Sequence, residues 1–84
     1  MRSPIPLGMS EALYELRRAR GSRISQRALS LAAGLGPNYV TRVEAGKKGL
    51  EAEAAGKLCA ALRKLGADPA KFRLAYLRAV GLDR

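Results

Sequence analysis

Residues 25–48 read SQRALSLAAGLGPNYVTRVEAGKK, and this stretch decides the fold. Ser25 is a good N-cap, because its hydroxyl can accept a hydrogen bond from the free backbone N–H groups that begin a helix. Alanine and leucine then recur at helical spacing as far as Ala33. Gly34 follows and tolerates the left-handed conformation in which helices end. We therefore predict a short helix over residues 26–33.

A second short helix is expected after a tight turn. Pro37 suits the first position of a helix, where its missing N–H costs nothing, and the helical pattern ends at Gly46. At about 100° per residue, Val40 and Val43 share the inner face of this helix. Two short helices joined by a tight turn form a helix-turn-helix, here over about residues 25–46.

The opposite face of the second helix carries Asn38, Thr41 and Arg42, with Tyr39 on its flank. In the major groove of DNA, Arg can pair with guanine and Asn with adenine, each through two hydrogen bonds. We therefore expect this face to read base edges. The alternative is an ordinary polar face in contact with solvent.

Residues 13–62 resemble the XRE family, the helix-turn-helix type of the lambdoid phage repressors and Cro proteins. The resemblance rests on the joint spacing of many residues rather than on any single one. The matching residues are Leu16, Arg17, Arg20, Gly21, Ser25, Gln26, Leu29, Ala32, Gly34, Leu35, Val40, Arg42, Val43, Glu44, Gly46 and Lys47. The resemblance implies an all-α, five-helix, lambda-repressor-like fold.

The resemblance also implies roles for single residues. Pro37 stands where the family has a polar base-reading side chain, so base reading should shift onto its polar neighbours. Arg17 and Glu44 occupy the positions of a structural ion pair between the first and third helices. The expected base-reading residues are Asn38, Thr41, Arg42 and Gln26. The expected phosphate contacts are Arg23, Arg27, Tyr39, Lys47 and Lys48.

Positive charge gathers on the helix-turn-helix. The 84-residue chain has 16 basic and seven acidic side chains, a formal net charge of +9. Residues 17–48 hold eight of the basic side chains and a single carboxylate, Glu44. A basic stripe on a small domain is the footprint of a polyanionic partner such as double-stranded DNA. The alternative is a solvated basic surface that serves only solubility.

The chain offers no catalytic constellation. It has no histidine and one cysteine, which excludes Ser-His and Cys-His arrangements, a histidine zinc site and an intramolecular disulfide. Cys59 lies among Leu58, Ala61 and Leu62 and is expected to pack as a small apolar residue, with a redox switch as the alternative. Residues 46–48 lack the other elements of a phosphate-binding loop. We expect no enzyme, metal or cofactor.

The N-terminal region is expected to hold an arm and a first helix. Residues 1–9 contain prolines without helical periodicity and are predicted to form a flexible arm, unless Met9 is the true start. Ser10 is the expected cap of a helix over residues 11–20. Residues 10–84 should then form a single domain.

Two longer helices are expected after the helix-turn-helix, over residues 51–65 and 69–80. Asp68 and Pro69 provide a cap and a first-turn proline for the second of them. The predicted inner stripes are Ala54, Ala55, Leu58, Ala61, Leu62 and Leu65 in the first, and Phe72, Ala75, Tyr76, Ala79 and Val80 in the second.

Leu74 and Leu77 lie on another face of the last helix. A terminal helix that is apolar on two sides has more hydrophobic surface than one core needs. We therefore expect these two residues to form a homodimer contact. The alternative is that they fold back against the first helix or the N-terminal arm.

These observations predict a sequence-specific DNA-binding transcriptional regulator, a homodimer on an inverted-repeat operator. No apolar run has the length of a membrane span or forms a signal-peptide core, so a cytoplasmic, nucleoid-associated protein is expected. Small lone domains of this kind suit control in phages, plasmids and other mobile elements. Two alternatives remain: an antitoxin or antiactivator that binds a regulatory protein partner, and a nonspecific nucleic-acid binder.

Overall fold

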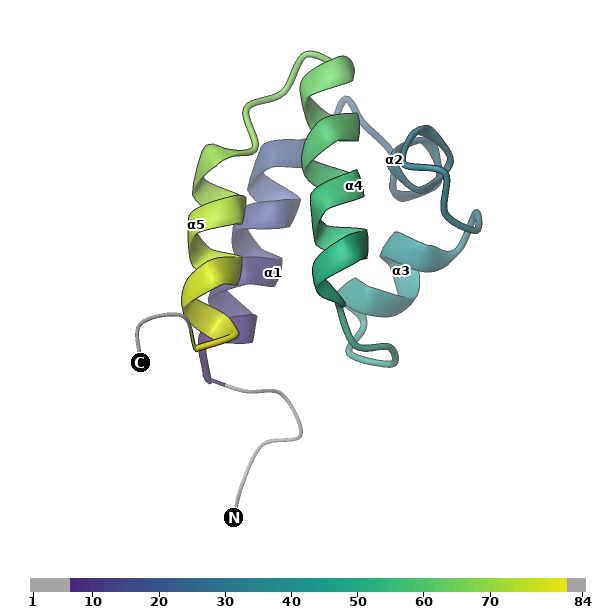
Figure 1. Cartoon of the computed structure of the whole chain (residues 1–84). Coiled ribbons are helices and arrows are strands. Elements are labelled where there is room, and N and C mark those ends of the chain that lie inside the picture. Colours follow the sequence, from purple (N-terminus) through teal and green to yellow (C-terminus); the bar gives the residue numbers. More distant parts are fainter. Residues whose placement is uncertain (1–6, 82–84) are drawn as a thin grey trace.

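The computed structural model describes residues 7–81, and these form five α-helices without a strand (Figure 1). The predicted all-α, five-helix class is confirmed. The helices are α1 (Leu7–Arg20), α2 (Gln26–Ala32), α3 (Tyr39–Glu44), α4 (Ala52–Lys64) and α5 (Ala70–Ala79).

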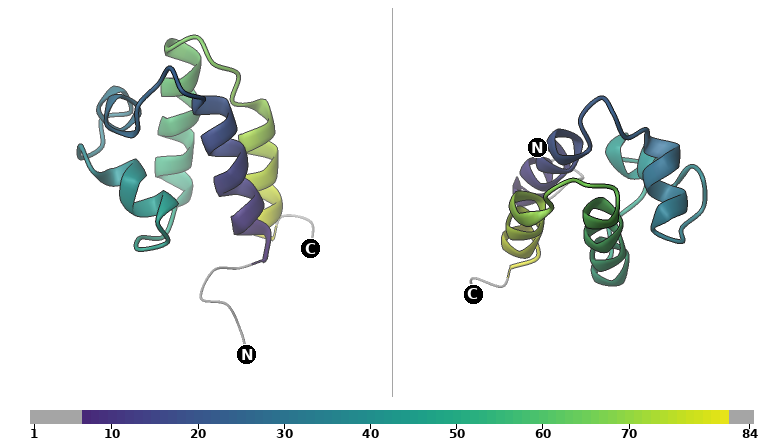
Figure 2. Two further views of the ribbon diagram at one scale, coloured as in Figure 1. Left: turned by 180° about the vertical axis from the view of Figure 1, so that it is seen from behind. Right: turned by 90° about the horizontal axis from the view of Figure 1, so that it is seen from above.

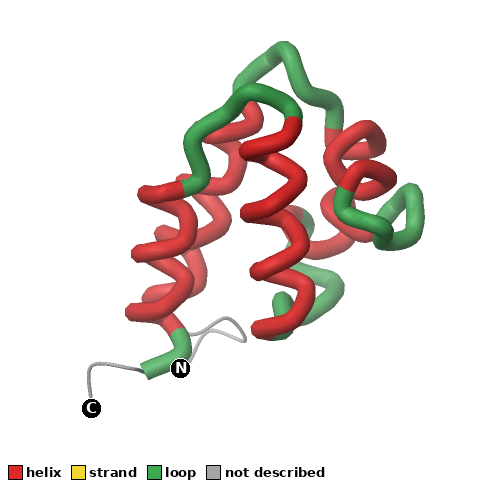
Figure 3. Tube along the Cα trace, turned by 45° about the horizontal axis from the view of Figure 1, so that its top comes forward, coloured by secondary structure: helices red, strands yellow, loops and turns green. Residues whose placement is uncertain are grey.

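The helices form two groups on either side of α4. α1 and α5 pack side by side and run in opposite directions, so α1 begins and α5 ends at the same end of the molecule (Figures 1 and 2). α2 and α3 pack against each other, and α2 also contacts α4. The turn between α2 and α3 lies at the edge of the molecule farthest from α5 (Figure 3).

One apolar core joins the two groups. Val40 and Val43 are buried on the inner face of α3, as their spacing predicted. The largest fully buried apolar side chains are Leu16, Leu29, Val40, Val43, Leu58, Leu62 and Phe72. Each such burial contributes about 1.5–3 kcal/mol relative to an exposed side chain. Because the core draws on all five helices, α3 is held against a continuous apolar support.

Both ends of α2 follow from local sequence signals. The Ser25 hydroxyl accepts a hydrogen bond from the backbone N–H of Ala28 at 2.9 Å, which confirms its role as the N-cap. The last helical residue is Ala32, Ala33 is the C-cap, and Gly34 follows with a φ of +76°. A residue with a Cβ would be strained there, so this glycine fixes where the chain turns toward α3.

α1 begins earlier than predicted. It starts at Leu7, so Ser10 lies inside the helix and is not its cap. Met9 is partly buried and packs against the core, which favours continuation of the helix beyond the expected start. Residues 7–9 are thus helical and not part of an arm, and residues 1–6 of the predicted arm lie outside the described residues.

α3 is shorter than predicted. Pro37 precedes it, and its first α-type backbone bond runs from the Arg42 N–H to the Asn38 carbonyl at 3.0 Å. Asn38 is therefore the N-cap residue, and its side chain makes no capping hydrogen bond. The Asn38 carboxamide is left available to other partners.

α4 and α5 match their predicted positions apart from their ends. Pro69 is the N-cap of α5 and Ala70 is its first helical residue, so the predicted cap at Asp68 and the predicted first-turn proline each lie one position too early. The Asp68 carboxylate still accepts a hydrogen bond from the Ala70 N–H at 3.0 Å. Leu65 and Val80, both expected on inner stripes, are 38% and 41% exposed. Each is the C-cap of its helix, where the chain turns away from the helical stripe, so the prediction was wrong at these two positions.

Candidate nucleic-acid interface

The outer face of α3 is polar and exposed. Asn38, Thr41 and Arg42 are all exposed, whereas Val40 and Val43 are buried behind them. The structure thus brings three of the four expected base-reading residues onto one accessible face. Their contact with bases stays a prediction.

A buried serine fixes α3 against α2. Ser30 is fully buried, and its hydroxyl accepts a hydrogen bond from the Val40 N–H at 2.9 Å and donates one to the Gln26 carbonyl at 2.8 Å. An unsatisfied buried N–H costs about 1–3 kcal/mol, so this contact stabilises the start of α3. This role of Ser30 was not predicted, although a serine between Leu29 and Leu31 was the available signal in the sequence.

An ion pair ties the end of α1 to the end of α3. Arg20 donates from Nε and Nη2 to the two carboxylate oxygens of Glu44, at 3.2 and 3.0 Å. The guanidinium also donates to the Ile24 carbonyl at 3.1 Å. Only 15% of the Arg20 side chain and 5% of the Glu44 side chain are exposed. Such a bidentate ion pair fixes the relative orientation of the two side chains as well as their distance.

The expected partner of Glu44 was Arg17, and this prediction was wrong. Arg17 is exposed and lies three residues before the end of α1. Arg20 is the last residue of that helix, beside the loop that leads to α2. From there its guanidinium reaches both the Ile24 carbonyl and Glu44, which Arg17 does not.

Gln26 connects this ion pair to the outer face of α3. Its Nε2 donates to Glu44 Oε1 at 2.8 Å, and its Oε1 accepts a hydrogen bond from the Thr41 hydroxyl at 3.0 Å. Gln26 is half-buried. A residue expected to contact DNA is therefore also a link within the protein.

The loop after α3 adds exposed positive charge. Lys47 and Lys48 are exposed, and Lys48 Nζ lies 5.6 Å from the centre of the Tyr39 ring. Tyr39 is half-buried; burial raises the pKa of its hydroxyl, the charge of Glu51 adds to the increase, and the backbone of Glu51 opposes it. The hydroxyl is therefore protonated at neutral pH and can donate a hydrogen bond. A shallow groove here is lined by Gly36, Pro37, Asn38, Tyr39, Arg42 and Lys48.

The other two expected phosphate contacts precede α3 in the sequence. Arg23 is in the loop after α1, and Arg27 is in the first turn of α2. Both are exposed. Exposed cations therefore come from the segments before and after α3 in the chain.

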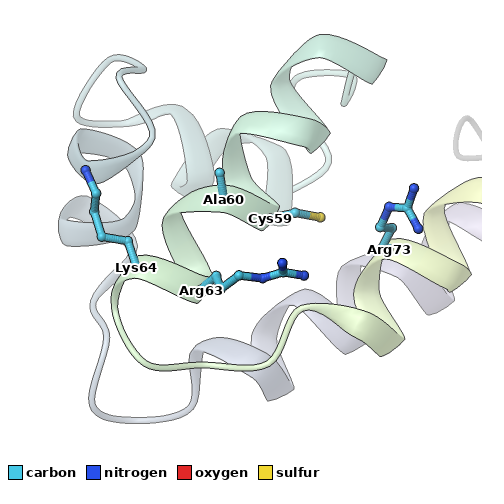
Figure 4. A pocket seen from close by; sticks show the side chains of 5 residues that line it. All are labelled: Cys59, Ala60, Arg63, Lys64 and Arg73. Carbon is cyan, nitrogen blue, oxygen red and sulfur yellow. The ribbon is translucent and has the colours of Figure 1, made fainter.

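A second hollow opens between α4 and α5 (Figure 4). Cys59 and Arg63 of α4 point toward Arg73 of α5 (Figure 4). Cys59 is half-buried and packs against the core, as expected of a small apolar residue. Burial raises the pKa of its thiol, while the two arginines partly oppose that increase. The thiol is therefore protonated at neutral pH, which does not favour a redox switch.

The described residues contain neither of two other kinds of site. Residues 7–81 include no group of three or more His, Cys, Asp or Glu side chains that could hold a metal ion. None of the five described helices is long and apolar enough to cross a membrane.

Residues 13–66 match the HTH_3 helix-turn-helix family, which is the XRE type. The chain belongs to the XRE family. The sequence resemblance and the lambda-repressor-like fold are thereby confirmed. XRE-family proteins are DNA-binding regulators and not enzymes, so the expectation of a non-enzymatic, DNA-binding protein is confirmed as well.

Two solved structures are similar to this XRE-family chain. The restriction-modification controller protein C.AhdI from Aeromonas hydrophila is 32% identical, with a TM-score of 0.55 over 79% of this chain and 92% of that chain. The clp gene regulator ClgR from C. glutamicum is 27% identical, with a TM-score of 0.58 over 93% and 97% of the two chains. No curated protein sequence matches the chain at a significant level.

Proposed function

We propose that this XRE-family regulator binds a specific operator by inserting α3 into the major groove. The observation that carries the proposal is the exposed row of Asn38, Thr41 and Arg42 on a helix whose other side is buried and hydrogen-bonded in place. An α-helix fits the major groove, where each base pair shows a distinct pattern of donors and acceptors. Arg42 would pair with guanine and Asn38 with adenine.

Backbone contacts would set the register of α3 on the duplex. The exposed cations before and after α3, together with the protonated Tyr39 hydroxyl, suit phosphate oxygens. Such contacts release counterions, so binding should weaken steeply as salt increases. The proposed phosphate contacts are Arg23, Arg27, Tyr39, Lys47 and Lys48.

The regulator would act as a homodimer through α5. Leu74 is 52% exposed and Leu77 is half-buried, while the opposite face of α5 packs on α1. A two-fold dimer would place two copies of α3 one helical turn apart, at about 34 Å, on an inverted repeat. The genes that it controls would lie on a mobile element, and the DNA would be in the cytoplasm. The similarity to a restriction-modification controller protein supports a role in regulation.

The test of specificity is selection of binding sites from a random DNA pool with the purified protein at physiological salt. An enriched inverted repeat is the expected result. An enriched single half-site would support specificity and contradict the dimer. Absence of enrichment with folded protein would overturn the proposal and favour a protein-partner function, such as that of an antitoxin or antiactivator.

Sedimentation tests the dimer separately. The double change Leu74→Glu and Leu77→Glu should give a folded monomer, because two carboxylates would have to be buried at the contact. Leu65→Glu is the control, since Leu65 is also exposed but is the C-cap of α4 and lies outside α5. A double variant that still sediments as a dimer would rule out this interface.

A further inference from the structure

Glu44, Gln26 and Thr41 are joined by two hydrogen bonds, and the chemistry of the three side chains fixes which atom donates in each. A carboxylate only accepts hydrogen bonds, and Glu44 Oε1 receives both Arg20 Nη2 at 3.0 Å and Gln26 Nε2 at 2.8 Å. A carboxamide carries one NH₂ group and one oxygen. Since the NH₂ group of Gln26 faces Glu44, the oxygen faces Thr41. The Thr41 hydroxyl therefore donates its only hydrogen to Gln26, at 3.0 Å.

The opposite orientation of Gln26 is disfavoured. If the carboxamide were turned over, its oxygen would lie at a hydrogen-bonding distance from Glu44 Oε1. Both oxygens are acceptors, so they would repel each other and form no hydrogen bond. Glu44 cannot easily exchange its partner for water, because only 5% of its side chain is exposed and Arg20 holds both of its oxygens. The ion pair in the interior thus sets the orientation of Gln26 nearer the surface.

This orientation decides what Thr41 can offer to DNA. A threonine hydroxyl that rotates freely can donate to a base or accept from it. Thr41 has already used its hydrogen on Gln26, so its exposed oxygen can only accept. In the major groove adenine and cytosine present an amino group, whereas guanine and thymine present carbonyl oxygens.

We propose that Gln26 fixes the Thr41 hydroxyl as an acceptor, so that the protein selects adenine or cytosine where Thr41 meets the operator. This inference rests on the proposed insertion of α3 into the major groove. Thr41 makes the contact with the base. Gln26 and Glu44 are positioning residues that act through Thr41.

The first test compares the operators selected by the wild-type protein and by Thr41→Val, which keeps the side-chain shape and loses the hydroxyl. One position should lose its preference, and the wild-type base there should be adenine or cytosine on the strand that Thr41 faces. Thr41→Ser keeps the hydroxyl and should keep the preference. A thymine or guanine at that position, or an unchanged profile for Thr41→Val, would overturn the inference.

A modified operator tests the base side of the same contact. Purine in place of adenine removes the 6-amino group, and for a cytosine site a pyrimidinone that lacks the 4-amino group does the same. Wild-type binding should fall roughly three- to tenfold, the range expected for one hydrogen bond. Thr41→Val should bind both operators equally. A similar loss for the two proteins would overturn the inference.

The positioning role is tested with Gln26→Met, which has a similar length and cannot orient the hydroxyl. The base preference at the Thr41 position should relax roughly threefold or more, because the hydroxyl could then donate or accept. The preference at the Arg42 position should stay unchanged and serves as the internal control. An unchanged preference at the Thr41 position would overturn the role of Gln26. Failure of the proposed function can be distinguished from failure of this inference, because in the first case the wild-type protein would enrich no operator at all.

Discussion

α1 and α5 are held together differently from α2 and α3. Apolar side chains fill the first interface, among them Leu16 of α1 and Phe72 of α5, both fully buried. The second pair also shares apolar residues, but its relative position is set by the Ser30 hydroxyl and by the chain of hydrogen bonds through Gln26 and Glu44.

The two kinds of contact serve different requirements. Apolar burial stabilises without strong directional demands, so the α1–α5 pair can supply stability without a unique angle. Hydrogen bonds weaken steeply when they are misaligned, so the α2–α3 pair holds α3 in one orientation. A helix that has to match a row of base edges needs directional hydrogen bonds to hold its orientation. The rest of the domain needs mainly the stability that apolar burial provides.

The largest effect is expected in the apolar pair. Phe72→Ala should lower the free energy of unfolding by about 3–5 kcal/mol, a large part of the roughly 5–15 kcal/mol that stabilises a small domain. Urea denaturation followed by circular dichroism measures the change. Lys71→Ala, next to it and exposed, should change stability by less than about 0.5 kcal/mol. A Phe72 variant as stable as the wild type would contradict the structural role of α5.

The ion pair should give the next largest effect. Arg20→Ala leaves Glu44 nearly buried without its charged partner and should lower the free energy of unfolding by about 2–3 kcal/mol. Arg17→Ala is the matched control, since Arg17 is exposed on the same helix, and should change it by less than about 0.5 kcal/mol. Equal losses in the two variants would show that Arg20 is not the partner.

The outer face of α3 should affect binding and not stability. Arg42→Ala should cost about 1–3 kcal/mol of binding free energy on the selected operator and relax the preference at one base pair. The midpoint of thermal unfolding should stay unchanged, because Arg42 is exposed. Competition binding with operator and random DNA measures the difference. An equal loss on both would contradict base reading by Arg42.

The smallest effect is expected in the loop after α3. Lys47→Ala should weaken binding to operator and random DNA alike and reduce the slope of log affinity against log salt by about 1. Titrations at several salt concentrations measure the slope. Lys71→Ala on α5 should leave the slope unchanged. A slope for Lys47→Ala equal to that of the wild type would show that Lys47 does not contact a phosphate.

The features that could be predicted from the sequence depend on neighbouring residues. The Ser25 cap, the stop at Gly34 and the inward valines of α3 involve positions a few residues apart, where helical geometry leaves little freedom. The exposed row on α3 followed from the same periodicity. These features located the helix-turn-helix and the candidate interface, whereas the five-helix fold was expected from the resemblance to the XRE family.

The features that could not be predicted depend on segments far apart in the chain. Whether Arg17 or Arg20 meets Glu44 depends on the path of the loop between α1 and α2, which periodicity does not describe. Likewise, the contact of Ser30 with the Val40 N–H and that of Gln26 with Thr41 form only after α2 and α3 are packed. The early start of α1 at Leu7 is accompanied by a contact of Met9 with the core, which also forms only in the folded chain.

The pairing of α1 with α5 also has a kinetic consequence. These helices stand at opposite ends of the described chain, with residues 21–69 between them, so their contact must close a long loop before it stabilises anything. Loop closure costs entropy, and contacts distant in sequence slow folding. The contacts of α2 with α3 are local and can form first. Apolar truncations in α5 should therefore speed unfolding more than they slow folding.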